Sequence, residues 1–192
     1  MDFLAELDAY TPPAGDGLAA AGEAADVALV RALVVGGDPW SRSAPVHVTG
    51  SAVVLHSPSR RVLLRWHERM GSWLHVGGHV DPGETSPRDA ARREAREETG
   101  LTDLVPWPDP TRPTIVHVAV VPVPAANGEP AHHHADVRYL LATARPDAAV
   151  PERPSAPLRW VDLAEAGALV GPDNLRITLA RLEALLDEHG PA

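Results

Sequence analysis

The chain has 192 residues, of which 44% are hydrophobic and 22% charged, and 26 acidic against 17 basic residues give a net charge of −9. These values are ordinary for one globular domain, and the acidic balance disfavours a general binder of DNA or of anionic membranes. The chain contains no cysteine, which excludes disulfides, thiolate nucleophiles and cysteine-bound metals. All 17 basic residues are arginines, so a Schiff-base lysine and a P-loop lysine are excluded as well.

The first residues bear on the location of the protein. Met1-Asp2-Phe3-Leu4 lacks the basic region and apolar run of a secretory signal, and the chain has no apolar run long enough to span a membrane. We therefore expect a cytoplasmic protein that acts neither at a membrane nor on DNA.

Two helices are predicted before the main domain. Residues 2–10 place apolar side chains on one side, and the alanine-rich residues 18–35 repeat apolar side chains at helical spacing. Prolines and glycines in residues 11–17 separate the two helices. We divide the chain into an N-terminal helical extension, residues 1–40, and a main domain, residues 41–192. The extension is expected either to cap the sheet of that domain or to form a homodimer contact.

The main domain begins with strands and a glycine-rich loop. From His47 the side chains alternate with a period of two, which predicts a strand that is buried on much of both faces. Further strands are predicted at residues 61–66 and 73–76, and a glycine-rich loop at residues 77–83. A helix follows over residues 86–100, with a serine and a proline at its start and a glycine at its end.

The rest of the chain continues to alternate strands and helices. Strands are predicted at residues 114–121, 136–143 and 158–161, the first two joined by an Ala-Ala-Asn-Gly turn. Two helices follow, beginning at Asp162 and Asp173. This order of elements predicts an α/β fold in which a mixed β-sheet is sandwiched between helices.

Three glutamates lie on one face of the predicted helix 86–100. Glu94, Glu97 and Glu98 occupy positions i, i+3 and i+4 and span an arc of about 100°. The like charges of Glu94 and Glu98 destabilise an isolated helix by about 0.2–0.5 kcal/mol, a cost that a bound cation would offset. Carboxylate-only sites suit hard ions such as Mg²⁺ or Mn²⁺.

The same helix also supports a simpler interpretation. Asp89, Arg93 and Glu97 form a ladder of alternating charge, which is typical of a solvent-exposed helix face. However, a row of small side chains that includes Ala91 and Ala95 allows the helix to lie close against a sheet with its glutamates along the edge. The glycine-rich loop before the helix favours anions at the helix N-terminus. Together these features favour a metal site beside a phosphate-binding loop.

The segment from Gly78 to Leu101 resembles the signature of the Nudix family, the Nudix box. It consists of Gly78, five residues, Glu84, eight residues and then Arg93-Glu94-Ala95-Arg96-Glu97-Glu98-Thr99-Gly100-Leu101. The family signature has one residue fewer between its first glutamate and its arginine. The extra residue falls at 85–87, where the loop meets the helix, so it affects the placement of Glu84 and leaves the spacing within the helix unchanged.

The resemblance implies the Nudix fold and a hydrolase that uses Mg²⁺ or Mn²⁺ to cleave a diphosphate bond in a nucleoside diphosphate derivative, or in another small-molecule diphosphate. By this likeness Glu97 and Glu98 are metal ligands, and Glu94 is a ligand or the base that activates water. Arg93 would orient the glutamates, and the carbonyl group of Gly77 would add a ligand. The catalytic candidates are therefore Glu94, Glu98 and Arg93.

A second cluster of polar residues follows later in the chain. In a strand, His132, His134 and Asp136 share one face, while His133 points to the opposite one. Such a face either lines the substrate site near the metal or lies on the shoulder of a hairpin. Because adjacent histidines point apart, a tetrahedral zinc triad is not expected from this run. His134 and Asp136 are predicted to bind substrate.

Three further residues are predicted to bind substrate. Arg65, on the strand before the glycine-rich loop, is suited to a phosphate, and Glu84 precedes the helix. Trp73 is suited to stacking on a base. A tryptophan beside a sheet also commonly belongs to the core, which is the alternative for Trp73.

Two other functions are compatible with parts of this pattern. One is a catalytically silent Nudix-like module for ligand binding or regulation, which the intact glutamate triad disfavours. The other is isopentenyl-diphosphate isomerisation on the same fold, whose mechanism uses a cysteine that this chain lacks. The diphosphate substrate itself is not predicted, because the loops that select it cannot be placed from the sequence.

Overall fold

The computed structural model describes residues 2–13, 18–126 and 128–190. Within these residues the α-helices are α1 (Phe3–Ala9), α2 (Leu18–Val35), α3 (Pro87–Thr99), α4 (Leu163–Leu169) and α5 (Asp173–His189). The strands are β1 (Val46–His56), β2 (Arg61–His67), β3 (Ser72–Leu74), β4 (Val76–His79), β5 (Val105–Pro106), β6 (Ile115–Val123), β7 (His132–Ala142) and β8 (Leu158–Asp162). None of these helices is both long and apolar enough to cross a membrane.

The described strands form one mixed sheet around β1. β1 runs parallel to β7 and antiparallel to β2 and β4, and β2 pairs in turn with β3 and β8. On the other side, β7 pairs antiparallel with β5 and β6. The parallel register sets His47 opposite His134 and Thr49 opposite Asp136. Polar residues that are far apart in the sequence therefore meet along β1 and β7.

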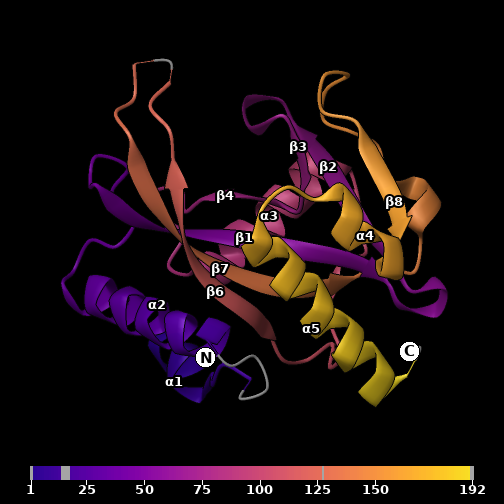
Figure 1. Cartoon of the computed structure of the whole chain (residues 1–192), viewed down its shortest axis with the longest axis horizontal. Coiled ribbons are helices and arrows are strands. Elements are labelled where there is room, and N and C mark those ends of the chain that lie inside the picture. The colour runs from indigo at the N-terminus through magenta and orange to yellow at the C-terminus, as the bar shows by residue number, and fades with distance from the viewer. Residues whose placement is uncertain (1, 14–17, 127, 191–192) are drawn as a thin grey trace.

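Helices cover both faces of this sheet (Figure 1). One core cluster packs α1, α2 and α3 against sheet residues that include Ala52 and Val137. The other packs α4 and α5 against residues that include Val53 and Leu140. Ala52 and Val53 enter opposite clusters because successive side chains of a strand point to opposite faces. The predicted α/β sandwich is confirmed.

Several strands differ from the sequence prediction: the predicted strand 73–76 is divided between β3 and β4, and β5 was not predicted. The first residues of the predicted loop 77–83 belong to β4, where Gly77 pairs with Ser51 of β1. A Cβ atom on Gly77 would lie 2.6 Å from the Ser51 Cα atom, so the glycine permits close strand pairing here. Strand β7 begins at His132 rather than at residue 136, because its first half pairs with both β1 and β6.

The N-terminal helices cover an edge of the sheet. Among the described strands β6 pairs only with β7, so the outer N–H groups of β6 need other partners. The Glu23 carboxylate of α2 accepts a hydrogen bond from the Val118 N–H at 2.7 Å, and Asp26 accepts one from the Val120 N–H at 3.0 Å. Glu23 also forms an ion pair with the buried Arg181 of α5 at 2.6 Å. Helix α2 therefore covers the free edge of β6. A domain boundary near residue 40 stays a prediction.

We expect Glu23→Ala to lower the free energy of unfolding by about 3–5 kcal/mol, because it removes the charge opposite a buried guanidinium and the acceptor of a buried N–H group. Urea denaturation followed by circular dichroism measures this change. The matched control is Glu183→Ala on an exposed position of α5, for which a change within about 0.5 kcal/mol is expected. Equal stability of the two variants would contradict the role assigned to Glu23.

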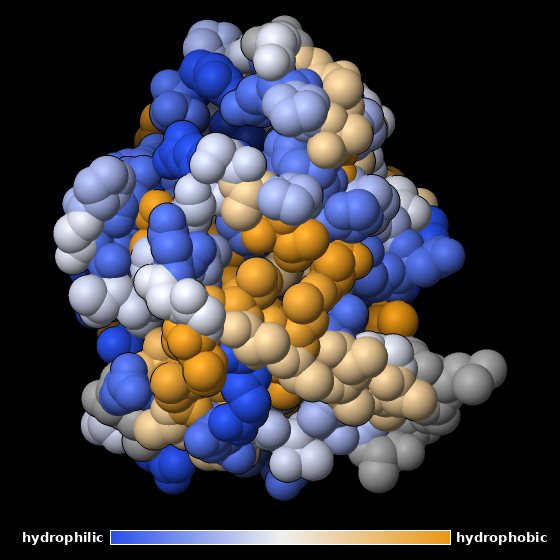
Figure 2. Space-filling view, turned by 90° about the vertical axis from the view of Figure 1, so that its left-hand side faces the viewer, coloured by the Kyte–Doolittle hydropathy of each residue, from blue (hydrophilic) through white to orange (hydrophobic). Residues whose placement is uncertain are grey.

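Figure 2 shows the side of the molecule that faces left in Figure 1. An apolar band crosses the middle of this face between hydrophilic regions. On α2, the large apolar side chains Leu29 and Val35 are exposed. A homodimer contact through the N-terminal extension stays a prediction, since nothing in the structure shows a partner.

Candidate active site

Helix α3 brings the predicted glutamates to one edge of the sheet. The Ser86 hydroxyl accepts a hydrogen bond from the Asp89 N–H at 3.3 Å at the start of the helix, and Gly100 ends it with a φ of 67°. Ala91 and Ala95 are buried, as the small-residue row of the sequence predicts. The close packing on this side leaves the glutamates along the neighbouring edge of the helix.

Arg93 is the centre of an ion-pair network on α3. Its guanidinium donates to the Glu84 carboxylate at 3.0 and 3.2 Å, to Glu94 at 2.9 Å and to Glu97 at 3.1 Å. It also donates to the carbonyl oxygen of His79 at 2.8 Å. With Asp81 at 3.4 Å, Arg93 thus pairs with four carboxylates, and it joins α3 to β4. The extra residue before the helix does not prevent Glu84 from reaching this network.

Glu98 lies next to β4 and β2. Its Oε2 atom accepts a hydrogen bond from the Gly77 N–H at 3.2 Å, and its Oε1 atom lies 3.2 Å from a guanidinium nitrogen of Arg65. Another nitrogen of Arg65 lies 3.4 Å from the Glu152 carboxylate. Burial raises the pKa of the Glu98 carboxyl to about 7, against the lowering influence of Arg65. Glu98 therefore changes its charge near neutral pH in the absence of another cation.

Glu94 lies against the backbone of Gly78. A Cβ atom on Gly78 would lie 2.3 Å from the Glu94 Oε1 atom and 2.6 Å from its Cδ atom, so glycine leaves the room that this carboxylate occupies. Burial raises the pKa of the Glu94 carboxyl, and the hydrogen bond from Arg93 opposes this shift. Strand β4 and helix α3 thus place two partly desolvated carboxylates beside the Gly77–Gly78 backbone.

The donor set at this edge fits a hard divalent cation. Glu94, Glu97 and Glu98 offer only carboxylate oxygens, and the two with raised pKa values would be ionised more readily beside a bound cation. In the structure these carboxylates are paired with Arg93 and Arg65. They do not converge within 4.8 Å of one another, whereas three histidines elsewhere in the described chain do. A metal contact of the Gly77 carbonyl group stays a prediction.

A large cavity of about 580 Å³ opens beside the carboxylates. The backbone of Gly77 and Gly78 forms part of its wall, and the same backbone contacts Glu94 and Glu98. The cavity also has an apolar lining, formed by Met70, Leu74, Val121, Pro122, Val123 and Leu175. Such a combination of apolar walls and a few polar groups is typical of a small-molecule site.

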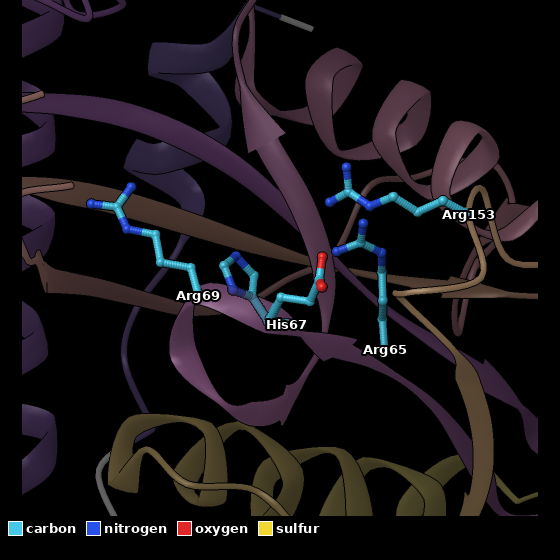
Figure 3. A pocket seen from close by; sticks show the side chains of 5 residues that line it. Arg65, His67, Arg69 and Arg153 are labelled. Atoms are coloured by element: carbon cyan, nitrogen blue, oxygen red, sulfur yellow. The ribbon is translucent and has the colours of Figure 1, made fainter. Parts of the chain in front are cut away.

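A second cavity, of about 430 Å³, is lined by Arg65, His67, Glu68, Arg69 and Arg153. We call it the arginine cavity. Figure 3 shows the guanidinium groups of Arg65 and Arg153 turned toward one another, with Arg69 extending to the other side. The two cavities adjoin, because His67 and Arg69 line both. Three arginines line this cavity and can donate to a phosphate or another anion, although Arg65 is paired with Glu98 and Glu152, and Arg69 lies 3.6 Å from Glu129.

Asp136 lies buried at the wall of the large cavity. It accepts hydrogen bonds from Thr49 at 3.0 Å, Ser51 at 2.7 Å, Arg138 at 2.9 Å and His75 at 3.2 Å. Burial acts to raise the pKa of Asp136, but the hydrogen bond from His75 and the charge of Arg138 outweigh it and hold the pKa well below its usual range. Both carboxylate oxygens are engaged, so Asp136 fixes the surrounding groups, and a direct contact with substrate stays a prediction.

The other residues predicted to bind substrate are separated in the structure. His134 lines the large cavity. Glu84 contacts Arg93 instead. Trp73 lies outside the described lining of both cavities and packs edge-on against Trp66, with ring centroids 5.6 Å apart, beside the core under α4 and α5. Trp73 is thus partly buried against this core, and its stacking on a base stays a prediction.

Several residues of the site were not singled out from the sequence. These residues are His47, His75, His79, Arg69 and Arg153. They lie outside the glutamate helix, and strand pairing or a long connection brings them to the site. The run of three histidines was the available signal for part of this group. The sequence does not predict which strands pair with the one that carries this run, because the parallel pairing of β1 with β7 joins distant parts of the sequence.

Comparisons with known proteins agree with this geometry. The family model described as NUDIX domain matches residues 46–182, which contain α3 and the lining of both cavities. A solved structure of an Ap4A hydrolase from C. elegans, in a binary complex, has a TM-score of 0.57 and 20% identity, and the match covers 73% of this chain and 98% of that one. A NUDIX family hydrolase from Clostridium perfringens has a TM-score of 0.51 and 19% identity, with 72% and 97% covered. Both share the fold of this chain.

Proposed function

This chain belongs to the Nudix family of pyrophosphohydrolases, and on that basis we propose that it cleaves a diphosphate bond in a nucleoside diphosphate derivative such as a nucleoside triphosphate. The proposed cofactor is Mg²⁺ or Mn²⁺, held by Glu94, Glu97 and Glu98. One observation supports this most directly: the carboxylate edge of α3 adjoins both cavities. The Gly77–Gly78 backbone connects the carboxylates to the large cavity, and Arg65 connects Glu98 to the arginine cavity.

The two cavities suit the two chemically different ends of such a substrate. The apolar walls of the large cavity fit a base or another flat group, while the buried Arg138 in its lining is paired with Asp136. The arginine cavity fits the phosphates, because Arg65, Arg69 and Arg153 surround it. A diphosphate that extends from one cavity to the other would pass the carboxylate edge.

The residues of α3 and β4 have distinct roles in the proposed reaction. A divalent ion, when bound, supplies positive charge that neutralises the diphosphate and makes water easier to deprotonate. Glu98 and Glu94 hold or accept a proton at their carboxylate oxygens, with Glu94 acting as ligand or as base. Arg93 keeps Glu84, Glu94 and Glu97 in place by the ion pairs described above.

A phosphate-release screen tests this function. The purified protein is incubated with Mg²⁺ or Mn²⁺ and nucleoside triphosphates, nucleotide sugars, ADP-ribose and dinucleoside polyphosphates. Ap4A is included because the C. elegans protein of similar fold is described as an Ap4A hydrolase. We expect turnover of at least one compound, and an at least about 100-fold lower rate when EDTA removes the metal, since the carboxylates alone cannot neutralise a diphosphate.

The same screen separates the enzyme from its alternative. Binding of a nucleotide without turnover under any metal condition would contradict the proposal and favour a catalytically silent binding or regulatory module. Turnover that EDTA leaves unchanged would retain a hydrolase but contradict the proposed role of the carboxylate edge.

A further inference from the structure

Histidines from three strands gather at one end of the sheet, outside the carboxylate edge. They are His47 of β1, His79 of β4, and His132 and His134 of β7. The ring of His47 lies 5.1 Å from that of His79, 5.2 Å from that of His132 and 5.0 Å from that of His134, measured between centroids. The sheet register explains this meeting, because His47 lies opposite His134 in the parallel pair and His79 lies opposite Thr49, two residues after His47.

Three of these histidines bring their ring nitrogens close together. One ring nitrogen from each of His47, His132 and His134 lies within 4.8 Å of the other two. The Nε2 atoms of His132 and His134 are 3.1 Å apart. Ligands of a tetrahedral ion with metal–nitrogen distances of about 2.0–2.1 Å are about 3.3 Å apart. The spacing therefore suits a first-row transition-metal ion after a small closure of the His47 ring.

Backbone carbonyl groups fix the orientation of two of the rings. The Nδ1–H of His132 donates to the carbonyl oxygen of Pro130 at 2.9 Å, and that of His47 donates to the carbonyl oxygen of Ala44 at 3.3 Å. In the neutral tautomer each bond leaves the opposite Nε2 atom unprotonated and able to act as a ligand, and the hydrogen bond between the Nε2 atoms of His132 and His134 then takes its proton from His134. A carbonyl on the far side of the ring is the usual support of a metal-binding histidine.

The Nε2 atom of His47 is buried and has no hydrogen-bond partner among the described residues. Leaving a buried acceptor without a partner costs about 1–3 kcal/mol, so this atom requires an explanation. An ion bound by the three rings would supply the missing partner. This orphaned nitrogen is an observation independent of the spacing of the rings.

Burial shifts the pKa values of three of the clustered histidines. Burial lowers the pKa of His47, and it lowers the pKa of His134 to about 3 and that of His79 to about 4. Arg42 and the neighbouring His132 lower the pKa values of His47 and His79, and Glu129 raises them. Arg42 is itself paired with Asp81 at 3.0 Å.

We propose that His47, His132 and His134 bind one first-row transition-metal ion of the zinc class, at a site separate from the carboxylates of α3. All three ligands are imidazoles, which suit zinc, nickel and copper, whereas the oxygen ligands of α3 suit magnesium and manganese. His134 also lines the large cavity, so the ion stands at the edge of the substrate site. Three protein ligands leave a fourth position for water or a substrate oxygen.

This site is not a triad of three consecutive histidines, which is not expected from the sequence. His133 points away from the cluster and is exposed, as expected for an adjacent strand residue. His47 of the parallel neighbour replaces it as the third ligand.

The test is a zinc titration of the full chain prepared without a histidine tag. In buffer with excess Mg²⁺, isothermal titration calorimetry should show one Zn²⁺ bound per chain, and Zn²⁺ should raise Tm. Co²⁺ in place of Zn²⁺ should give the visible absorption of a tetrahedral site. We expect His132→Ala and His47→Gln to lower the Zn²⁺ affinity at least about tenfold, the smallest effect usual for weakening a metal site.

Two controls locate the site. His133→Ala removes the neighbouring histidine, and Glu98→Gln alters the carboxylate edge, and neither should change the Zn²⁺ affinity. Circular dichroism and the metal-free Tm show whether each variant folds. If His47→Gln does not fold, the Zn²⁺ affinity of His132→Ala alone decides the test. The proposal is overturned if the wild type binds no Zn²⁺, or if His133→Ala weakens Zn²⁺ binding as much as His132→Ala. It is also overturned if Glu98→Gln is the only variant that weakens Zn²⁺ binding. These readouts do not depend on turnover, so they can fail separately from the proposed hydrolase function.

Discussion

Replacing Glu98 with glutamine should lower kcat for the diphosphate substrate at least about 100-fold, the lower range for loss of a group that moves a proton. The amide keeps the size of the side chain and can still accept the hydrogen bond from the Gly77 N–H. It cannot carry the negative charge that a divalent cation requires or take up a proton from water. Steady-state kinetics on the best compound of the phosphate-release screen measures the change.

The fold should survive this substitution. Burial raises the pKa of Glu98 to about 7, so the folded state disfavours its charged form, and the neutral amide avoids that cost above neutral pH. The loss of the ion pair with Arg65 opposes this gain, although Glu152 remains as a second partner of Arg65. We therefore expect Tm to change by less than about 4 °C, equivalent to about 1 kcal/mol for a chain of this size.

The matched control is Glu188→Gln at an exposed position of α5, which should leave both kcat and Tm unchanged. Wild-type kcat in Glu98→Gln would contradict a catalytic role for this carboxylate. A large fall in Tm would instead show that Glu98 acts mainly in the structure.

The helix of the site could be predicted because its signals are local. Ser86 and Gly100 mark its ends, and the spacing of Glu94, Glu97 and Glu98 fixes their common face. The buried Ala91 and Ala95 row follows from the same period. For this helix, residues within one turn of each other are enough to predict its ends and its faces, and the structure shows the same ends and faces.

The surroundings of the helix could not be predicted, because they depend on pairing between distant strands. His47 and His134 meet through the parallel β1–β7 register, which no short pattern specifies. Arg153 reaches the arginine cavity from the connection before β8. The sequence also does not predict that Gly77 belongs to a strand, because two adjacent glycines usually indicate a loop. In the structure Gly77 and Gly78 instead permit the close approach of β4 to β1 and α3.

Close approach is most severe at Gly50, where β1 lies against the start of α3. A Cβ atom on Gly50 would lie 1.9 Å from the carbonyl oxygen of Pro87 and 2.7 Å from its carbonyl carbon. Real side chains do not tolerate such distances, and the contact is with backbone, which cannot rotate away as a side chain can. Alanine at this position therefore requires α3 to move away from the sheet.

We expect Gly50→Ala to lower the free energy of unfolding by at least about 3 kcal/mol, the upper range for overpacking. The displacement would also separate Glu94 from Gly78 and Glu98 from Gly77, so kcat should fall even in the folded fraction. Urea denaturation and activity per folded molecule measure the two effects.

Gly22→Ala provides the control, because nothing lies within 4 Å of a Cβ atom at this helical position of α2. It should raise the free energy of unfolding by about 0.5–1 kcal/mol, since alanine favours a helix over glycine. If Gly50→Ala proved as stable as the wild type with full activity, α3 could not lie as close to β1 as the structure places it. The position of the glutamates beside β4 would then be wrong as well, because the same packing sets both.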